Sequence, residues 1–67
     1  MGKVLWEGPE DREYVLTWQT AGATGYVYNV QRVEETASLL WVWTGPGPGE
    51  WVGLPLAGLR QVTLEAR

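Results

Sequence analysis

The sequence predicts an all-β protein, either a small antiparallel barrel of five to six strands or a compact sandwich, with no substantial helix. Two observations support this fold class. Short stretches alternate apolar and polar residues with a period of two, which is typical of strands with one buried face. Turn signals containing glycine or proline separate these stretches at regular intervals. With 67 residues, the chain has the size of SH3-like or OB-like domains, and residues 1–67 are expected to form one domain.

The first two strands are predicted over Lys3–Glu7 and Glu13–Thr20. In the first, Val4 and Trp6 are expected to share a face because they are two residues apart. The dipeptide Gly8-Pro9 ends this strand and begins a charged turn. The second strand has the clearest alternation in the chain. Its large apolar face carries Tyr14, Leu16 and Trp18.

A third strand is predicted over Tyr26–Glu34, after a connection with two glycines that suits a hairpin. The residues at Glu34–Ser38 are too few to form a stable helix, so a polar turn is expected there. One face of this third strand is expected to carry Tyr26, Tyr28, Val30 and Arg32.

The most apolar stretch of the chain is Leu39–Thr44, which a Gly-Pro-Gly-Pro-Gly loop follows. An unbroken apolar run between turn signals is typical of a strand with both faces covered. Trp41 and Trp43 share one face of this strand. If Leu40 and Val42 face the core, the indole pair lies outside. In so small a protein, another part of the chain or another molecule would then have to cover it.

Two further strands are predicted over Trp51–Leu56 and Leu59–Ala66, with a turn at Ala57-Gly58 between them. The earlier strand contains Pro55, which cannot donate a hydrogen bond to a neighbouring strand. We therefore expect it at the edge of a sheet or interrupted by a bulge. The inward face of the last strand is expected to carry Val62, Leu64 and Ala66.

Size and composition limit how such a fold is stabilised. A core of this size supplies roughly 3–5 kcal/mol unless a further device supports it. The chain has no Cys and no His, which excludes disulfides and thiolate metal sites and removes the commonest metal ligand. It has five Trp and three Tyr, more aromatic surface than so short a chain readily buries. We expect Trp6, Trp18 and Trp41 in the core, and self-association to cover aromatic side chains left outside.

The residues that could act as nucleophiles, acids or bases are not arranged in a way that favours catalysis. The lone Ser38 has no histidine to activate it, and the adjacent Glu34 and Glu35 would point to opposite faces of a strand. The sequence therefore predicts a protein that is not an enzyme and has no cofactor or metal. The five basic residues are scattered in a chain of net charge −3, so neither nucleic acid nor an anionic membrane is an expected partner.

The amino-terminal residues and the overall composition indicate where the protein is located in the cell and the kind of organism it comes from. The amino-terminal residues lack the apolar core of a signal peptide, and no stretch approaches the length of a membrane span. A cytoplasmic location, or a place within a larger particle, is the expectation. Arg is preferred over Lys, and Glu over Asp, while thermolabile residues are scarce. This composition favours a thermophilic origin.

The functional prediction is non-enzymatic protein–protein interaction, as a structural or accessory subunit that associates with itself or within a larger assembly. Trp and Tyr are enriched at interfaces because one end of each tolerates water. The candidate interface comprises Tyr28, Trp41, Trp43, Pro46, Pro48 and Trp51. One alternative is a carbohydrate-binding module, with Gln19, Asn29 or Gln31 as polar partners beside the rings. Another is a small acidic inhibitor whose negative patch contains Glu7, Glu10, Asp11, Glu13 and Glu50.

Overall fold

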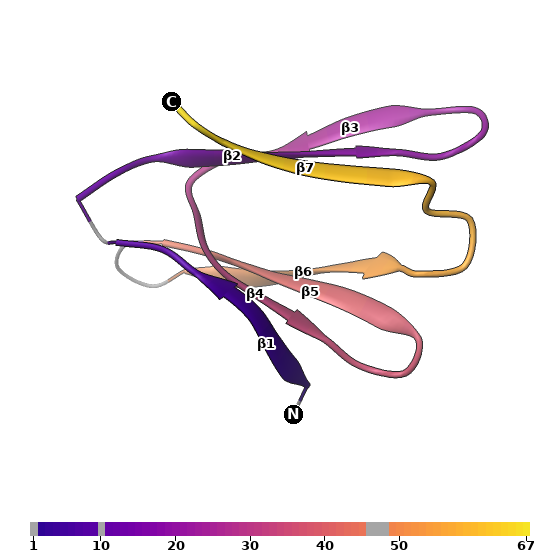
Figure 1. Ribbon diagram of the computed structural model, residues 1–67, viewed down its shortest axis with the longest axis horizontal. Helices are drawn as coiled ribbons and strands as arrows, with labels where there is room; N and C mark the ends of the chain where they lie inside the picture. Colours follow the sequence, from indigo (N-terminus) through magenta and orange to yellow (C-terminus); the bar gives the residue numbers. More distant parts are fainter. Residues whose placement is uncertain (1, 10, 46–48) are drawn as a thin grey trace.

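The computed structural model describes residues 2–9, 11–45 and 49–67, and shows seven strands and no helix in them (Figure 1). The all-β prediction is confirmed, whereas the expected number of five to six strands is too low. The strands are β1 (Lys3–Glu7), β2 (Tyr14–Gln19), β3 (Thr24–Val27), β4 (Val30–Glu35), β5 (Leu39–Thr44), β6 (Glu50–Pro55) and β7 (Gln61–Ala66).

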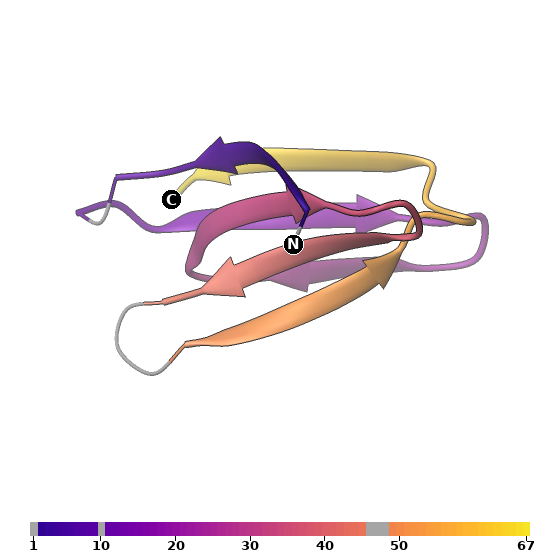
Figure 2. The same ribbon diagram turned by 90° about the horizontal axis from the view of Figure 1, so that it is seen from below.

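The strands form two antiparallel sheets that lie in two layers (Figures 1 and 2). One sheet has the strand order β1-β4-β5-β6, and the other has the order β3-β2-β7. The chain crosses between the sheets after β1, after β3 and after β6. β6, which contains Pro55, lies at the edge of the four-stranded sheet, as the proline predicts.

The predicted single strand over Tyr26–Glu34 is wrong, because the chain divides there into β3 and β4, which belong to different sheets. The division falls at Asn29, whose φ of 58° lies in the left-handed region. This conformation ends the extended backbone and sends the chain across to the other layer. Asparagine tolerates it better than other residues with a side chain, because its short amide can hydrogen-bond locally.

Substitutions of Asn29 therefore test whether its left-handed backbone conformation is needed for the chain to cross between the sheets. Asn29→Val is expected to destabilise the fold by about 1–2 kcal/mol, because a β-branched residue is strained at positive φ. Asn29→Gly should leave stability nearly unchanged, because glycine adopts this conformation freely. Urea titrations followed by circular dichroism measure both. If the valine variant were as stable as the glycine variant, the backbone at this crossing would not be left-handed.

Two β-bulges reverse the expected faces. The register shifts between Val4 and Trp6 in β1, and between Val30 and Arg32 in β4. Each shift inserts one extra residue into the strand, so the residue before the insertion and the residue after it point to opposite faces of the sheet. Val4 therefore does not share a face with Trp6, and Val30 does not share one with Arg32, which corrects both predictions.

The core lies between the two sheets and consists of aliphatic side chains only. Its buried members are Leu16, Val27, Val30, Val33, Leu40, Val42 and Leu54. Trp6 and Trp18 are half-buried and pack against this cluster, and the Trp6 ring meets Tyr14 edge-on at 4.8 Å between centroids. In β7, Leu64 packs on the core, and the register places Val62 and Ala66 on the same face, as predicted.

Candidate functional site: a tryptophan face

Trp41 and Trp43 lie on the face of β5 that is turned away from the three-stranded sheet. Leu40 and Val42, which alternate with them, are 5% and 0% exposed and belong to the core. The expectation that Trp41 lies in the core is therefore wrong. Trp51 of β6 is directly opposite Trp43 in the register and so shares their face, and it is 36% exposed. We call this outer side of the four-stranded sheet, with Trp41, Trp43, Trp51, Arg32 and Glu34, the tryptophan face.

The three indoles of the tryptophan face form a cluster joined through Trp51, whose ring is parallel to neither of the other two. The Trp43 and Trp51 rings are 5.1 Å apart between centroids and tilted by 55°. The Trp41 and Trp51 rings are 6.4 Å apart and nearly perpendicular, at 87°. Such edge-to-face contacts are the favoured arrangement of aromatic pairs. The rings therefore form walls at an angle to one another and not a single flat platform.

A glycine in the neighbouring strand positions one of these walls. Gly53 of β6 is the register partner of Trp41, and a Cβ built on it would come within 3.1 Å of the indole. The absence of a side chain at Gly53 thus lets the Trp41 ring lie across β6. Glycine and proline are both unfavourable within a strand. In β6, Gly53 and Pro55 both lie on the side that faces outward with Trp51.

Three charged residues extend the tryptophan face across β4 to β1. The Arg32 guanidinium donates from Nε to Glu34 Oε2 at 2.7 Å and from NH1 to Glu7 Oε2 at 2.8 Å. The Glu34 side chain is 7% exposed, whereas that of Glu7 is 61% exposed. The hydrogen bond to Glu34 raises the pKa of Arg32 above its ordinary value, and the charges of both carboxylates act in the same direction while desolvation opposes them. Arg32 therefore stays charged, and its guanidinium donates hydrogen bonds to two carboxylates.

Three hollows lie on the tryptophan face and its margin. The Trp41–Trp51 hollow, of about 420 Å³, is lined by Glu34, Thr36, Trp41 and Trp51. The second, of about 360 Å³, is lined by Arg32, Glu34, Trp43 and Trp51. The third, of about 660 Å³, is lined by Glu7, Gly8, Pro9, Gln31, Arg32 and Trp43. Arg32 thus lines two of the three hollows but not the first.

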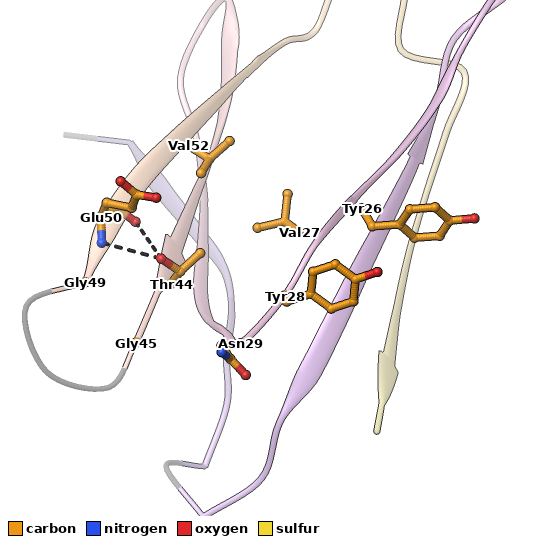
Figure 3. Close-up of a pocket in the computed structure, with 9 residues that line it drawn as sticks. All are labelled: Tyr26, Val27, Tyr28, Asn29, Thr44, Gly45, Gly49, Glu50 and Val52. Carbon is orange, nitrogen blue, oxygen red and sulfur yellow. Dashed lines mark hydrogen bonds between the residues drawn. The ribbon is translucent and has the colours of Figure 1, made fainter.

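Tyr28 does not join the tryptophan face. It follows β3, is 52% exposed, and lines a different hollow of about 440 Å³ at the base of the loop between β5 and β6 (Figure 3). In that hollow, the Thr44 hydroxyl donates to the Glu50 carbonyl at 3.3 Å. The Tyr28 ring stacks on Tyr26 at 6.4 Å and lies under the Arg67 guanidinium at 5.6 Å. The predicted interface residues Pro46 and Pro48 lie outside the described residues.

The predicted acidic patch is partly neutralised where the structure describes it. Glu7 is paired with Arg32, and Glu13 lies 3.9 Å from Arg67. Glu50 is in β6, at the far end of the hollow that contains Tyr28. Glu10 lies outside the described residues. Asp11 shares a hollow with Arg12 and Arg67, so positive charges lie among the described carboxylates of the predicted patch.

Two further findings concern the described part of the chain. Within residues 2–9, 11–45 and 49–67, there is no cluster of three or more acidic side chains that could hold a metal ion. In the same residues, no helix is long and apolar enough to span a lipid bilayer.

The sequence analysis found the three indoles but missed Arg32, Glu34 and Thr36 as their neighbours. Glu34 was expected to begin a polar turn, and Arg32 was expected on the face of Val30. A signal was nevertheless present, because Arg32 and Glu34 are two residues apart and share a face of any strand. Only the pairing of β4 with β5 shows that this face is that of Trp41 and Trp43.

The fold and the tryptophan face together define a small two-sheet β protein with an aromatic and partly charged outer surface. Comparisons of this chain with protein families, with curated proteins and with solved structures find no match.

Proposed function

We propose that this protein is a non-enzymatic interaction module that associates with a second copy of itself through the tryptophan face. The observation that carries this proposal is the distribution of aromatic side chains. The core is filled by leucine and valine, while three of the five Trp are on the outer side of one sheet. Trp, with Tyr and Arg, is enriched among the residues that contribute most of the binding energy near the centres of protein interfaces.

The size of the tryptophan face sets the expected strength of association. Four strands ~4.8 Å apart and about six residues long give a face roughly 20 Å square. This is less than the ~800 Å² per partner that is typical of stable complexes. Burial of apolar surface still contributes roughly 25 cal/mol per Å², which reinforces a small core. We therefore expect a dimer that dissociates on dilution.

Light scattering across a dilution series from about 1 mM to about 1 µM tests this, because weak complexes of small area dissociate in that range. The wild-type mass should fall from that of two chains to that of one chain, 7.5 kDa. Trp43→Ala should have the mass of one chain throughout. Tyr26→Ala, which removes a 58% exposed aromatic ring from the other sheet, should behave as the wild type.

Two results would contradict the proposal. One is a wild-type chain that is monomeric at every concentration. The other is a Trp43→Ala variant that dimerises as well as the wild type does. Far-UV circular dichroism of each variant confirms that any loss of association occurs in a folded chain.

A carbohydrate-binding module is the second candidate function, and the surroundings of Trp43 favour it. Gln31, Arg32 and Glu7 line a hollow beside this indole, and all three could bond to sugar hydroxyls. Trp fluorescence during titration with soluble polysaccharides tests this candidate. A saturable change that Gln31→Ala abolishes would support it, and an unchanged spectrum would contradict it.

A further inference from the structure

The Trp41–Trp51 hollow has two aromatic walls at a right angle. The ring centroids are 6.4 Å apart and the planes meet at 87°. Glu34 and Thr36 line the remaining sides. The Thr36 hydroxyl donates to the Leu39 carbonyl at 3.3 Å and accepts from the Leu39 backbone N–H at 3.2 Å, so its hydrogen-bonding capacity is used within this turn. The surface of the hollow is almost entirely apolar, and Glu34 is its one charged lining residue.

The charge of that carboxylate is only partly compensated. Glu7, Arg32 and Glu34 together carry one positive and two negative charges, and Arg32 divides its hydrogen bonds between the two carboxylates. Glu34 is 7% exposed, and a buried carboxylate with incomplete pairing is costly. Lys3 is the register partner of Glu35, which places it on the opposite face of the sheet from Glu34.

Arg32 reaches Glu34 from only one side. The hollow that contains Trp43 is lined by both Arg32 and Glu34, whereas the Trp41–Trp51 hollow is lined by Glu34 without Arg32. A cation in the latter hollow would therefore be bordered by Glu34 and two indoles, and Arg32 does not line that hollow.

We propose that the Trp41–Trp51 hollow binds an alkylammonium group, such as a trimethylammonium, between its two indoles and the Glu34 carboxylate. A cation is attracted to the face of an indole within about 6 Å of the ring centroid, and Trp is the most effective ring. The apolar methyl groups of the ligand suit the apolar walls. A sugar would find too few polar partners there, an anion would be repelled by Glu34, and a divalent metal ion needs several oxygen ligands. This site goes beyond self-association, and its lining does not include Trp43.

The first experiment titrates the wild-type chain with choline, at a protein concentration at which light scattering gives the mass of one chain. The control ligand is 3,3-dimethylbutan-1-ol, in which carbon replaces the quaternary nitrogen. Binding is followed through the indole N–H resonances in NMR spectra. We expect choline to shift the signals of Trp41 and Trp51 more than that of Trp18, and to bind about 10-fold more tightly than the neutral compound. Equal binding of the two compounds would overturn the proposal.

Two matched variants test whether Glu34 is the carboxylate that attracts the ammonium group. Glu34→Gln keeps the shape of the side chain and should weaken choline binding about 10-fold, because the opposite charge is lost. Glu7→Gln removes a carboxylate from the same ion network outside the hollow, and should weaken choline binding much less than Glu34→Gln does, because the carboxylate beside the indoles is retained. Equal weakening in both variants would overturn the assignment to Glu34. The comparison of ligands uses the wild type and so decides the question even if Glu34→Gln does not fold.

The source of the ammonium group is tested by a short peptide that contains trimethyllysine. If the natural ligand is a modified protein side chain, the peptide binds more tightly than choline. If it is a small molecule, choline binds at least as tightly. Binding of neither probe would overturn the proposal. Because self-association is measured separately with Trp43→Ala, failure of the ammonium site and failure of self-association give different results.

Discussion

Leu16→Ala is expected to leave a large fraction of the molecules unfolded at 25 °C. Leu16 is 1% exposed and lies in β2, the central strand of the three-stranded sheet, opposite Val27 and Leu64. Removing a buried leucine side chain costs about 2–5 kcal/mol, because apolar burial is lost and a cavity remains. A core of this size supplies roughly 3–5 kcal/mol in total. A single truncation at this position can therefore remove nearly the whole free energy of unfolding.

The measurement is a urea titration followed by Trp fluorescence and far-UV circular dichroism. Leu5→Ala is the matched control, because Leu5 is 48% exposed at the β1 bulge and should change stability by less than about 0.5 kcal/mol. If the two leucine variants were equally stable, Leu16 would not be the centre of the core.

Gly25→Ala is expected to destabilise the fold by about 1–3 kcal/mol, the usual cost of forcing extra atoms into a packed site. Gly25 in β3 is the register partner of Trp18, whose indole lies across it. A Cβ built on Gly25 would overlap that ring. Because Trp18 packs against the core, the ring cannot move without disturbing the contact between the sheets.

Gly22→Ala provides the control for this prediction, since a Cβ at Gly22 would have no atom within 4 Å. It should be neutral or stabilising by about 0.4–1 kcal/mol, through the reduced freedom of the unfolded chain. Thermal unfolding of both variants gives the comparison. Equal melting temperatures would show that the Trp18 indole does not rest on Gly25.

Much of the secondary structure could be predicted because strand alternation and turn residues are local signals. Lys3–Glu7 and Leu39–Thr44 have the predicted bounds, and Pro55 correctly indicated an edge strand. The failures occur where the alternation is interrupted. The bulges in β1 and β4 each depend on the pairing with another strand, which no local pattern records.

The candidate site was predictable only in part, for the same reason. The sequence shows that Trp41 and Trp43 share a face, and the register adds Trp51 to them. Tyr28 was grouped with them on the ground of residue type, but it precedes the crossing at Asn29 and lines a separate hollow with Thr44 and Glu50, at the base of the loop between β5 and β6. Arg32 and Glu34 join the indoles because β4 pairs with β5 after the bulge has turned Arg32 outward.

The sequence by itself determined that this chain is all-β, where most of its strands run, and that its aromatic residues exceed what a small core requires. Only the tertiary structure decided which face of Leu39–Thr44 is inside. The three-stranded sheet covers the side of Leu40 and Val42 and leaves Trp41 and Trp43 outside. The physical reason is that alternation fixes which residues lie together on a face, whereas burial of that face depends on what packs against it.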